Sequence, residues 1–262
     1  MRYRFLYQTG HKVVEFIDYL GELTLFFLEA CRTLRHRPWF FREIIAQMYQ
    51  LGVMSFPLIV VASFAVGLVL AMQGLVVLTY FGAANYIATT VAYTFFRGMG
   101  PVLAGVMLAS RGGAGIGAEI GSMRVTNQID ALTVSAVNPM KYLVVTRIVA
   151  CMLVMPLLTT FADIIGILGG MFIGVFQVGM TPAFYYALTI KWLMVRDVLP
   201  GICMTVVFGM IIGTVACFHG YTTKHGTFGV GQATKISVVV AILLLLVSDV
   251  FLTKITIVLF PT

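Results

Sequence analysis

Long apolar stretches separated by short polar segments dominate the chain from residue 49 onwards. A helix needs about 20 consecutive apolar residues to cross the hydrocarbon core of a bilayer, which is roughly 30 Å thick. Stretches of at least this length lie at about residues 51–80, 86–110, 142–177, 198–219 and 236–260. The pattern therefore predicts an all-α integral membrane protein whose residues 49–262 form a domain of five transmembrane helices.

Residues 1–48 have a different pattern and are expected to form a separate cytoplasmic or interfacial helical segment. Four acids interrupt the apolar residues here, and they fall within about 60° of one another on a helix: Glu15, Asp18, Glu22 and Glu29. So many charges disfavour a crossing of the membrane. We expect an N-terminal amphipathic helix that lies in the cytoplasmic interface of the membrane. Packing of this helix against the body of the protein is an equally good interpretation.

Composition and charge agree with a membrane protein. Only 10% of the 262 residues are charged and 60% are hydrophobic, whereas soluble domains carry about 25% charged residues. The net charge of +7 does not indicate a nucleic-acid partner, because the basic residues fall mostly between the expected spans. Of the 17 Lys and Arg residues, only Lys191, Arg196 and Lys254 would lie outside if the N-terminus is cytoplasmic, and Arg97 falls within the second span. The positive-inside rule thus predicts a cytoplasmic N-terminus and a periplasmic C-terminus.

Motifs for nucleotide binding, catalysis or metal binding are not found. Residues 112–122 are glycine-rich, but the chain contains no G-x-x-x-x-G-K-[ST] sequence, so no ATP site is expected in this chain. The spacing of Gly113, Gly117 and Gly121 instead favours close helix packing. Neither H-E-x-x-H nor G-x-S-x-G occurs, and the histidines lack the spacing of metal ligands. We therefore expect no catalytic residue, no metal and no cofactor in this chain.

The connection between the second and third spans, residues 111–142, has the features of a short cytoplasmic helix. Ile120 and Met123 are spaced for one helix face, polar residues lie between them, and Pro139 would end the helix. Such a helix could receive a soluble partner, or it could be an ordinary loop helix.

This segment also carries a resemblance to a known family. Residues 118–132, AEIGSMRVTNQIDAL, resemble the signature of the MlaE/YrbE permeases of ABC-type lipid transporters, which work with MCE-domain proteins. Further similarities are Gln73-Gly74, Arg97 with Gly100-Pro101, Asn138-Pro139 with Arg147, and Gly231 with Ala233-Thr234. The chain differs from the usual family pattern at Gly98, where an acid normally follows the arginine, and at Asn127, where Glu is usual.

The resemblance implies a permease subunit of an ATP-driven transporter that moves phospholipid between the inner membrane and an MCE-protein conduit toward the outer membrane. It implies a multi-pass inner-membrane homodimer with a role in outer-membrane lipid asymmetry. Two cytoplasmic ABC ATPases would bind the ATP and Mg²⁺, sometimes with a small accessory cytoplasmic subunit. A periplasmic MCE-domain protein would complete the complex.

Two groups of candidate site residues follow. Arg97 is an unusual cation within a span and is expected to contact a lipid phosphate. The alternative is a structural arginine that bonds to backbone carbonyls freed by Pro101, which should kink the helix. A cavity for acyl chains is expected along the outer half of the first span, lined by Leu70, Gln73, Val77, Leu78, Tyr80 and Phe81. The cytoplasmic helix would couple the permease to the ATPase through Glu119, Ile120, Met123, Arg124, Gln128, Asp130 and Leu132.

Two other classes of function remain open from the residues. A proton-coupled secondary carrier could use Asp163, which lies in the third span, although a structural helix–helix contact is the simpler interpretation. An intramembrane lipid-modifying enzyme would need paired catalytic groups, and Asp163 and Asp249 fall in different spans. Asp249 could pair with Lys254.

Tyr185 and Trp192, in an aromatic segment after the third span, are expected to anchor the protein at the membrane interface.

Overall fold

The computed structural model describes residues 2–34, 40–192, 195–224 and 226–259, and this part of the chain contains helices and no strand. Five helical segments are long and apolar enough to cross a membrane, which confirms the predicted fold class. They cover Phe41–Tyr80, Ala84–Val125, Met140–Phe176, Val198–Tyr221 and Gly226–Val258.

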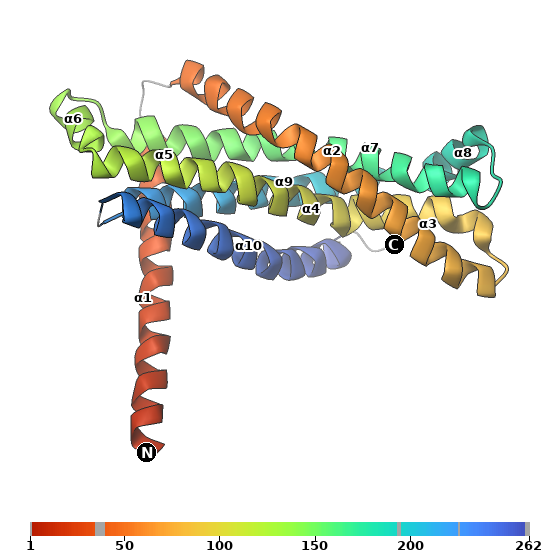
Figure 1. Cartoon of the computed structure of the whole chain (residues 1–262), viewed down its shortest axis with the longest axis horizontal. Helices are drawn as coiled ribbons and strands as arrows, with labels where there is room; N and C mark the ends of the chain where they lie inside the picture. The colour runs from red at the N-terminus through yellow and green to blue at the C-terminus, as the bar shows by residue number, and fades with distance from the viewer. Residues whose placement is uncertain (1, 35–39, 193–194, 225, 260–262) are drawn as a thin grey trace.

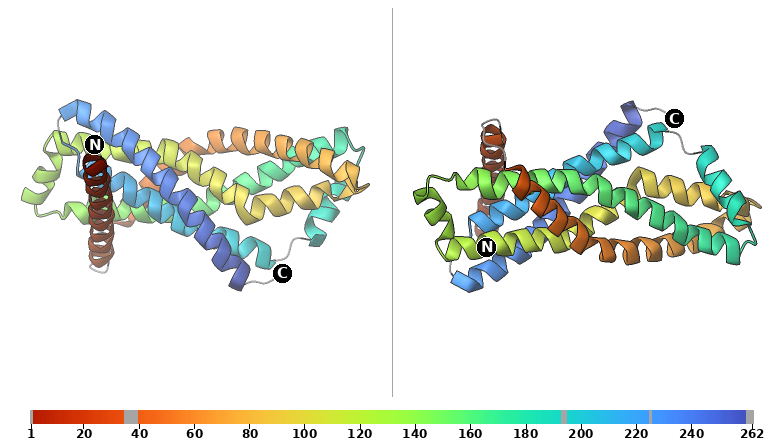
Figure 2. Two further views of the ribbon diagram at one scale, coloured as in Figure 1. Left: turned by 90° about the horizontal axis from the view of Figure 1, so that it is seen from below. Right: turned by 90° about the horizontal axis from the view of Figure 1, so that it is seen from above.

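The spans run antiparallel to their neighbours in sequence (Figures 1 and 2). The first is α2 (Phe41–Tyr80), and the second is built from η1 (Ala84–Tyr86), α3 (Ile87–Thr94), η2 (Phe95–Met99), α4 (Gly100–Leu108), η3 (Ala109–Gly113) and α5 (Ala114–Val125). After α6 (Gln128–Val134), the third span joins η4 (Met140–Val145) to α7 (Thr146–Phe176). α8 (Pro182–Trp192) leads to α9 (Val195–Tyr221), and α10 (Gly226–Leu259) is last.

Two ends of this bundle can be distinguished in Figure 1. We call the end that carries α6 and the start of α10 the inner end, and the end that carries α3 and α8 the outer end.

Buried apolar residues form two clusters. The larger one extends through the inner part of the bundle, and the smaller one lies at the outer end between α2, α3, α7 and α8.

The N-terminal helix α1 (Arg2–Leu34) stands across the long axis of the bundle at its inner end (Figure 1). Phe26 and Ala30 are buried against the bundle, whereas Ile17, Leu25 and Leu28 remain exposed. The Tyr19 hydroxyl forms a hydrogen bond of 2.9 Å with Nε2 of His219 on α9. Burial raises the pKa of Tyr19 to about 12. The helix thus packs against the body with one face, as the second interpretation predicted, and leaves other apolar residues exposed. Its position in the membrane interface stays a prediction.

The second span is longer than its hydropathy suggested. Its apolar stretch ends near residue 110, but the helical segment continues to Val125, so the connection expected at residues 111–142 is much shorter. The helix expected around residues 118–132 is consequently divided between α5 and α6 by a turn in which Asn127 adopts a left-handed conformation with φ of 58°. Tight packing explains the continuation: a Cβ added at Gly121 would lie 3.1 Å from Thr223 and 3.5 Å from Val230. Tertiary packing here outweighs the low helix propensity of glycine.

Glycines also hold α2 and α7 together. A Cβ at Gly67 would collide with the carbonyl oxygen of Gly166, and a Cβ at Gly166 would collide with the ring of Phe95. Small residues at such positions let helix backbones approach each other closely in a membrane. This contact places Gly67, Gly166 and Phe95 at one depth in the bundle.

Candidate functional site

Arg97 lies in the π-helical segment η2, in the middle of the second span. Its side chain is half-buried, and its guanidinium carbon lies 4.7 Å from the centre of the Tyr93 ring in a cation–π contact. Pro101 follows in α4 and cannot donate a backbone hydrogen bond, and the helix is locally widened in the turn just before it. The protein thereby holds a cation at a depth where it must face protein, water or a polar ligand.

The residues expected to line an acyl cavity lie nearer to the outer end than Arg97. Gln73 is six residues beyond Gly67, which shares the depth of Phe95, and at 1.5 Å per residue it lies about 9 Å further out. Val77, Tyr80 and Phe81 are strongly exposed, as is Gln73. Leu70 and Leu78 instead pack against the outer cluster of buried residues. The candidates therefore form a mainly apolar wall that lies further toward the outer end than Arg97.

An apolar hollow at another place in the bundle was not expected from the sequence. A cavity of about 360 Å³ lies between α7 and α8 and is lined mainly by apolar side chains, among them Phe96, the neighbour of Arg97. Its other walls include Ile164, Leu168, Met171 and Ile190. No sequence signal distinguishes such residues from lipid-facing ones, because both are simply apolar.

Tyr185 also lines this cavity, and the prediction that it is an interfacial anchor is wrong. The side chain is 1% exposed, its ring packs against Gly170 and Gly174, and its hydroxyl donates a hydrogen bond of 3.5 Å to the carbonyl of Ile167. Burial raises the pKa of this hydroxyl above its usual value of 10. The neighbouring Tyr186 is exposed, as an anchor requires. The side chain of Trp192 lies outside the described part of the structure.

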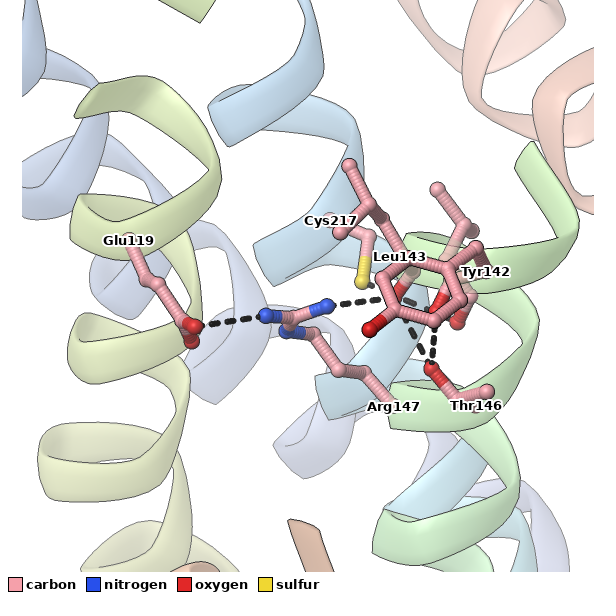
Figure 3. A network of polar contacts seen from close by, with 7 residues as sticks. Glu119, Tyr142, Leu143, Thr146, Arg147 and Cys217 are labelled. Atoms are coloured by element: carbon pink, nitrogen blue, oxygen red, sulfur yellow. Dashed lines mark hydrogen bonds and ion pairs between the residues drawn. The ribbon is translucent and has the colours of Figure 1, made fainter. Parts of the chain in front are cut away.

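At the inner end, the carboxylate of Glu119 forms an ion pair with Arg147. Arg147 Nη2 lies 2.8 Å from Glu119 Oε1, and Nη1 donates a hydrogen bond of 2.9 Å to the carbonyl oxygen of Leu143. Figure 3 shows the guanidinium reaching from α7 toward α5, beside Cys217 of α9. Arg147 is only 3% exposed, whereas the Glu119 side chain is 38% exposed. The pair therefore ties the inner end of the second span to the start of the third.

Arg147 was part of the family resemblance but was not chosen as a site residue. The available signal was one cation at the start of a long apolar run, which is costly unless it is paired. Its partner could not be identified from the sequence, because the fold brings Glu119 and Arg147 together from two different spans.

The other coupling candidates separate into buried and exposed groups. Ile120 is fully buried, and Met123 and Leu132 pack against the core. Their side chains therefore support the inner end from within. Gln128 is exposed on α6. Arg124 and Asp130 form an exposed ion pair of 3.0 Å across the turn.

A further exposed residue on α6 was missed. Val134 is 89% exposed at the end of this helix. With Gln128 and Asp130 it forms an exposed surface at the tip of the inner end.

The two intramembrane acids differ in their surroundings. Asp163 is 2% exposed and packs directly against Gly100, where a Cβ would collide with the carboxylate. This contact joins the second and third spans, as the structural interpretation of Asp163 predicted. Within the described residues no ion pair joins Asp249 and Lys254, so the expected pairing is not observed.

Comparisons with known proteins agree with this architecture. A sequence model of the family described as Permease MlaE matches residues 44–255. A probable ABC transporter permease protein of Rickettsia conorii is 39% identical over 245 residues, which cover 94% of this chain and 95% of that protein. The intermembrane phospholipid transport system permease protein MlaE of Haemophilus influenzae is 32% identical over 254 residues, covering 96% and 97%. A probable ABC transporter permease protein of a Synechocystis species is 34% identical over 211 residues, covering 80% of each chain.

Proposed function

Because the chain belongs to the MlaE permease family, we propose that it is the membrane subunit through which a partner ATPase moves phospholipid between the inner membrane and an MCE-protein conduit. The relative from Haemophilus influenzae is named for intermembrane phospholipid transport and is similar over nearly the whole chain. The family itself implies an ATPase partner.

The position of Arg97 carries the phospholipid assignment. A half-buried guanidinium in mid-span is expensive unless something polar meets it, and a phosphate is a preferred partner because arginine can donate two parallel hydrogen bonds to it. The exposed apolar residues of outer α2, among them Val77 and Tyr80, lie further out along the same bundle. A phospholipid with its phosphate at Arg97 and its acyl chains against the apolar residues further out would match this order of polar and apolar surfaces along the bundle.

Coupling to the ATPase is assigned to the inner end. The exposed tip of α6 would receive the partner, and the ion pair between Glu119 and Arg147 would transmit its movement to the start of α7. α7 packs along α2 through Gly67 and Gly166, so a shift of α7 would reach the wall that carries Val77. ATP and Mg²⁺ would be bound by the partner and not by this chain.

The assembly proposed is a homodimer in the inner membrane with its inner end in the cytoplasm and its C-terminus in the periplasm. Cytoplasmic ABC ATPases would bind at the inner end, in some complexes with an accessory subunit, and a periplasmic MCE-domain protein would cover the outer end. Few Lys and Arg residues lie in the segments assigned to the outside, and this charge distribution supports the orientation.

The test is phospholipid transfer by the complete reconstituted complex. Arg97→Ala is expected to abolish ATP-dependent transfer of a fluorescent phospholipid between proteoliposomes and acceptor vesicles, while ATPase and MCE subunits still co-purify with the variant. Arg97→Lys keeps the charge but loses the bidentate geometry and should retain a minor part of the activity.

Lys254→Ala is the matched control, because it removes an exposed cation near the outer end of α10. This variant should transfer lipid at the wild-type rate. Normal transfer by Arg97→Ala would remove the arginine from the lipid path, and transfer without any ATPase would replace the proposed mechanism by that of a carrier.

A further inference from the structure

Another hollow, lined by both polar and apolar residues, lies at the inner end, away from Arg97. It has a volume of about 200 Å³ and lies between α2 and the segment formed by η3 and α5. One wall carries Arg111, Gly115 and Glu119, which are spaced by four residues and so share one helix face. The facing wall carries Gln47 and Ser55 of α2. The volume is far larger than the roughly 15 Å³ that a single water molecule needs.

The charges of this hollow favour an anion. Glu119 is already neutralised by Arg147, whose Nη2 lies 2.8 Å from the carboxylate. Arg111 is exposed and forms no hydrogen bond or ion pair with the described residues. One positive charge therefore remains uncompensated in a hollow that Gln47 also lines.

Ser55 is the observation that points to a ligand in the hollow. Its side chain is 1% exposed, and its hydroxyl oxygen has no hydrogen-bond partner among the described residues. A buried hydroxyl without a partner costs about 1–3 kcal/mol, so native structures usually provide one. Ser55 lines the hollow together with Arg111. Its hydroxyl oxygen is covered, so a small rotation of the side chain toward the hollow would let a ligand oxygen satisfy it.

The depth of the hollow identifies the ligand. Arg111 follows directly after the second apolar stretch, and Gln47 and Gln50 precede the first one, which begins at Leu51. Both positions correspond to the boundary between hydrocarbon and headgroups at the inner end. At this level the abundant anion is a lipid phosphate, and the exposed side chain of Met54 offers an apolar surface beside it.

We propose that this hollow binds the phosphate of a phospholipid from the cytoplasmic leaflet, held by Arg111, Ser55 and Gln47. It is a site separate from the one assigned to Arg97, which lies in the middle of the span. Arg111 supplies the charge-assisted hydrogen bonds, Ser55 donates its hydroxyl proton, and Gly115, which has nothing within 4 Å of a Cβ position, leaves room for the headgroup.

The test is photo-cross-linking in nanodiscs of phosphatidylethanolamine and ³²P-labelled phosphatidylglycerol, with a benzophenone amino acid in place of Met54. Arg111→Gln should lower the labelling at position 54 about tenfold, since a hydrogen bond to a charged group contributes a factor of this size. Ser55→Ala should lower it about threefold and should not weaken the fold, because it removes a buried hydroxyl that lacks a partner. Equal labelling in both variants and in the wild type would overturn the proposal.

Two controls make the result specific. Arg42→Gln removes an exposed cation from the same helix outside the hollow, and a cross-linker in place of Val61, which is 70% exposed, reports on bulk lipid. Neither signal should change. If inorganic phosphate abolishes the labelling at position 54, the site is one for a soluble anion and the lipid assignment is wrong. This experiment measures lipid binding at the inner end, so its result does not depend on the transport test of Arg97.

Discussion

The inner and outer ends of the bundle are held together by different kinds of contact. At the inner end, a large apolar cluster packs around Arg147, the buried partner of Glu119, and the second half of α1 packs against this cluster. At the outer end, the buried cluster is small, and the last turns of α2 expose Val77, Tyr80 and Phe81. The inner end is thus packed as one unit around a buried ion-pair partner, whereas the outer end leaves apolar surface exposed. The following changes test this difference, from the largest expected effect to the smallest.

The largest effect is expected from Glu119→Gln, which leaves the guanidinium of Arg147 buried without its counter-charge. Breaking such a pair from the exposed side typically costs about 3 kcal/mol or more. The thermal unfolding midpoint of the purified protein in detergent should fall clearly. Arg147→Met should cost less, because the half-exposed Glu119 that remains can be hydrated. Equal losses for the two variants would contradict the burial difference between the partners.

Gly67→Ala should have the next largest effect. Its new methyl group would collide with the backbone carbonyl of Gly166, and overpacking of this kind costs about 1–3 kcal/mol. Gly231→Ala is the control, since nothing lies within 4 Å of a Cβ there, and it should be neutral or slightly stabilising. Unfolding midpoints that do not separate the two variants would show that α2 and α7 are not packed through this glycine.

A smaller, pH-dependent effect is expected where α1 meets α9. Tyr19 has a pKa of about 12 in the folded protein instead of 10, so the folded state resists loss of the proton. The docking energy that depends on this hydroxyl, about 1 kcal/mol for its hydrogen bond, is complete below pH 10 and is lost as the pH rises from 10 to 12.

Cys31 on α1 and Cys203 are exposed free cysteines, whereas Cys151 and Cys217 are buried. A spin label on Cys31, in a background with Cys203→Ser, would report this loosening as increased mobility. Tyr19→Phe has no proton to lose and should show the same label mobility from pH 9 to pH 12. If the label in Tyr19→Phe gains mobility with pH as it does in the wild type, the loosening comes from another titrating group.

The smallest effect is expected from Arg124→Ala. Its ion pair with Asp130 is exposed on both sides, and such pairs contribute about 0–1 kcal/mol. The unfolding midpoint should change little, and any change should vanish at high salt. Binding of the partner ATPase should nevertheless weaken in a pull-down, because the turn before α6 is part of the proposed docking tip. Unchanged ATPase binding would move the docking surface elsewhere.

Hydropathy and length were enough to predict five spans and a separate N-terminal helix, because both follow from the cost of placing polar groups in a bilayer. Hydropathy placed the end of the second span too early. The glycine-rich segment that contains Gly117 and Gly121 has a low hydropathy and a low helix propensity, and only the structure shows the residues that pack against it. Tyr185 was misplaced for a similar reason: α7 offers it Gly170 and Gly174, which only the fold reveals.

Single unusual residues were easier to find than pairs. Arg97 stands out in the sequence because a cation in mid-span is rare, and the structure places it in a π-helical segment. The ion pair of Glu119 with Arg147 and the hollow around Ser55 each need two spans side by side. Contacts of this kind leave no pattern in a single sequence.

The most direct test of the account asks whether ATP at the inner end changes lipid contact at the outer end. A benzophenone amino acid in place of Val77, in the complete complex with ³²P-labelled phospholipid, would report that contact. The account predicts that lipid labelling at position 77 differs severalfold between the nucleotide-free complex and one trapped with ATP, and that Glu119→Gln reduces the difference. Labelling that is the same in both nucleotide states would contradict a mechanism in which the inner end drives the outer one.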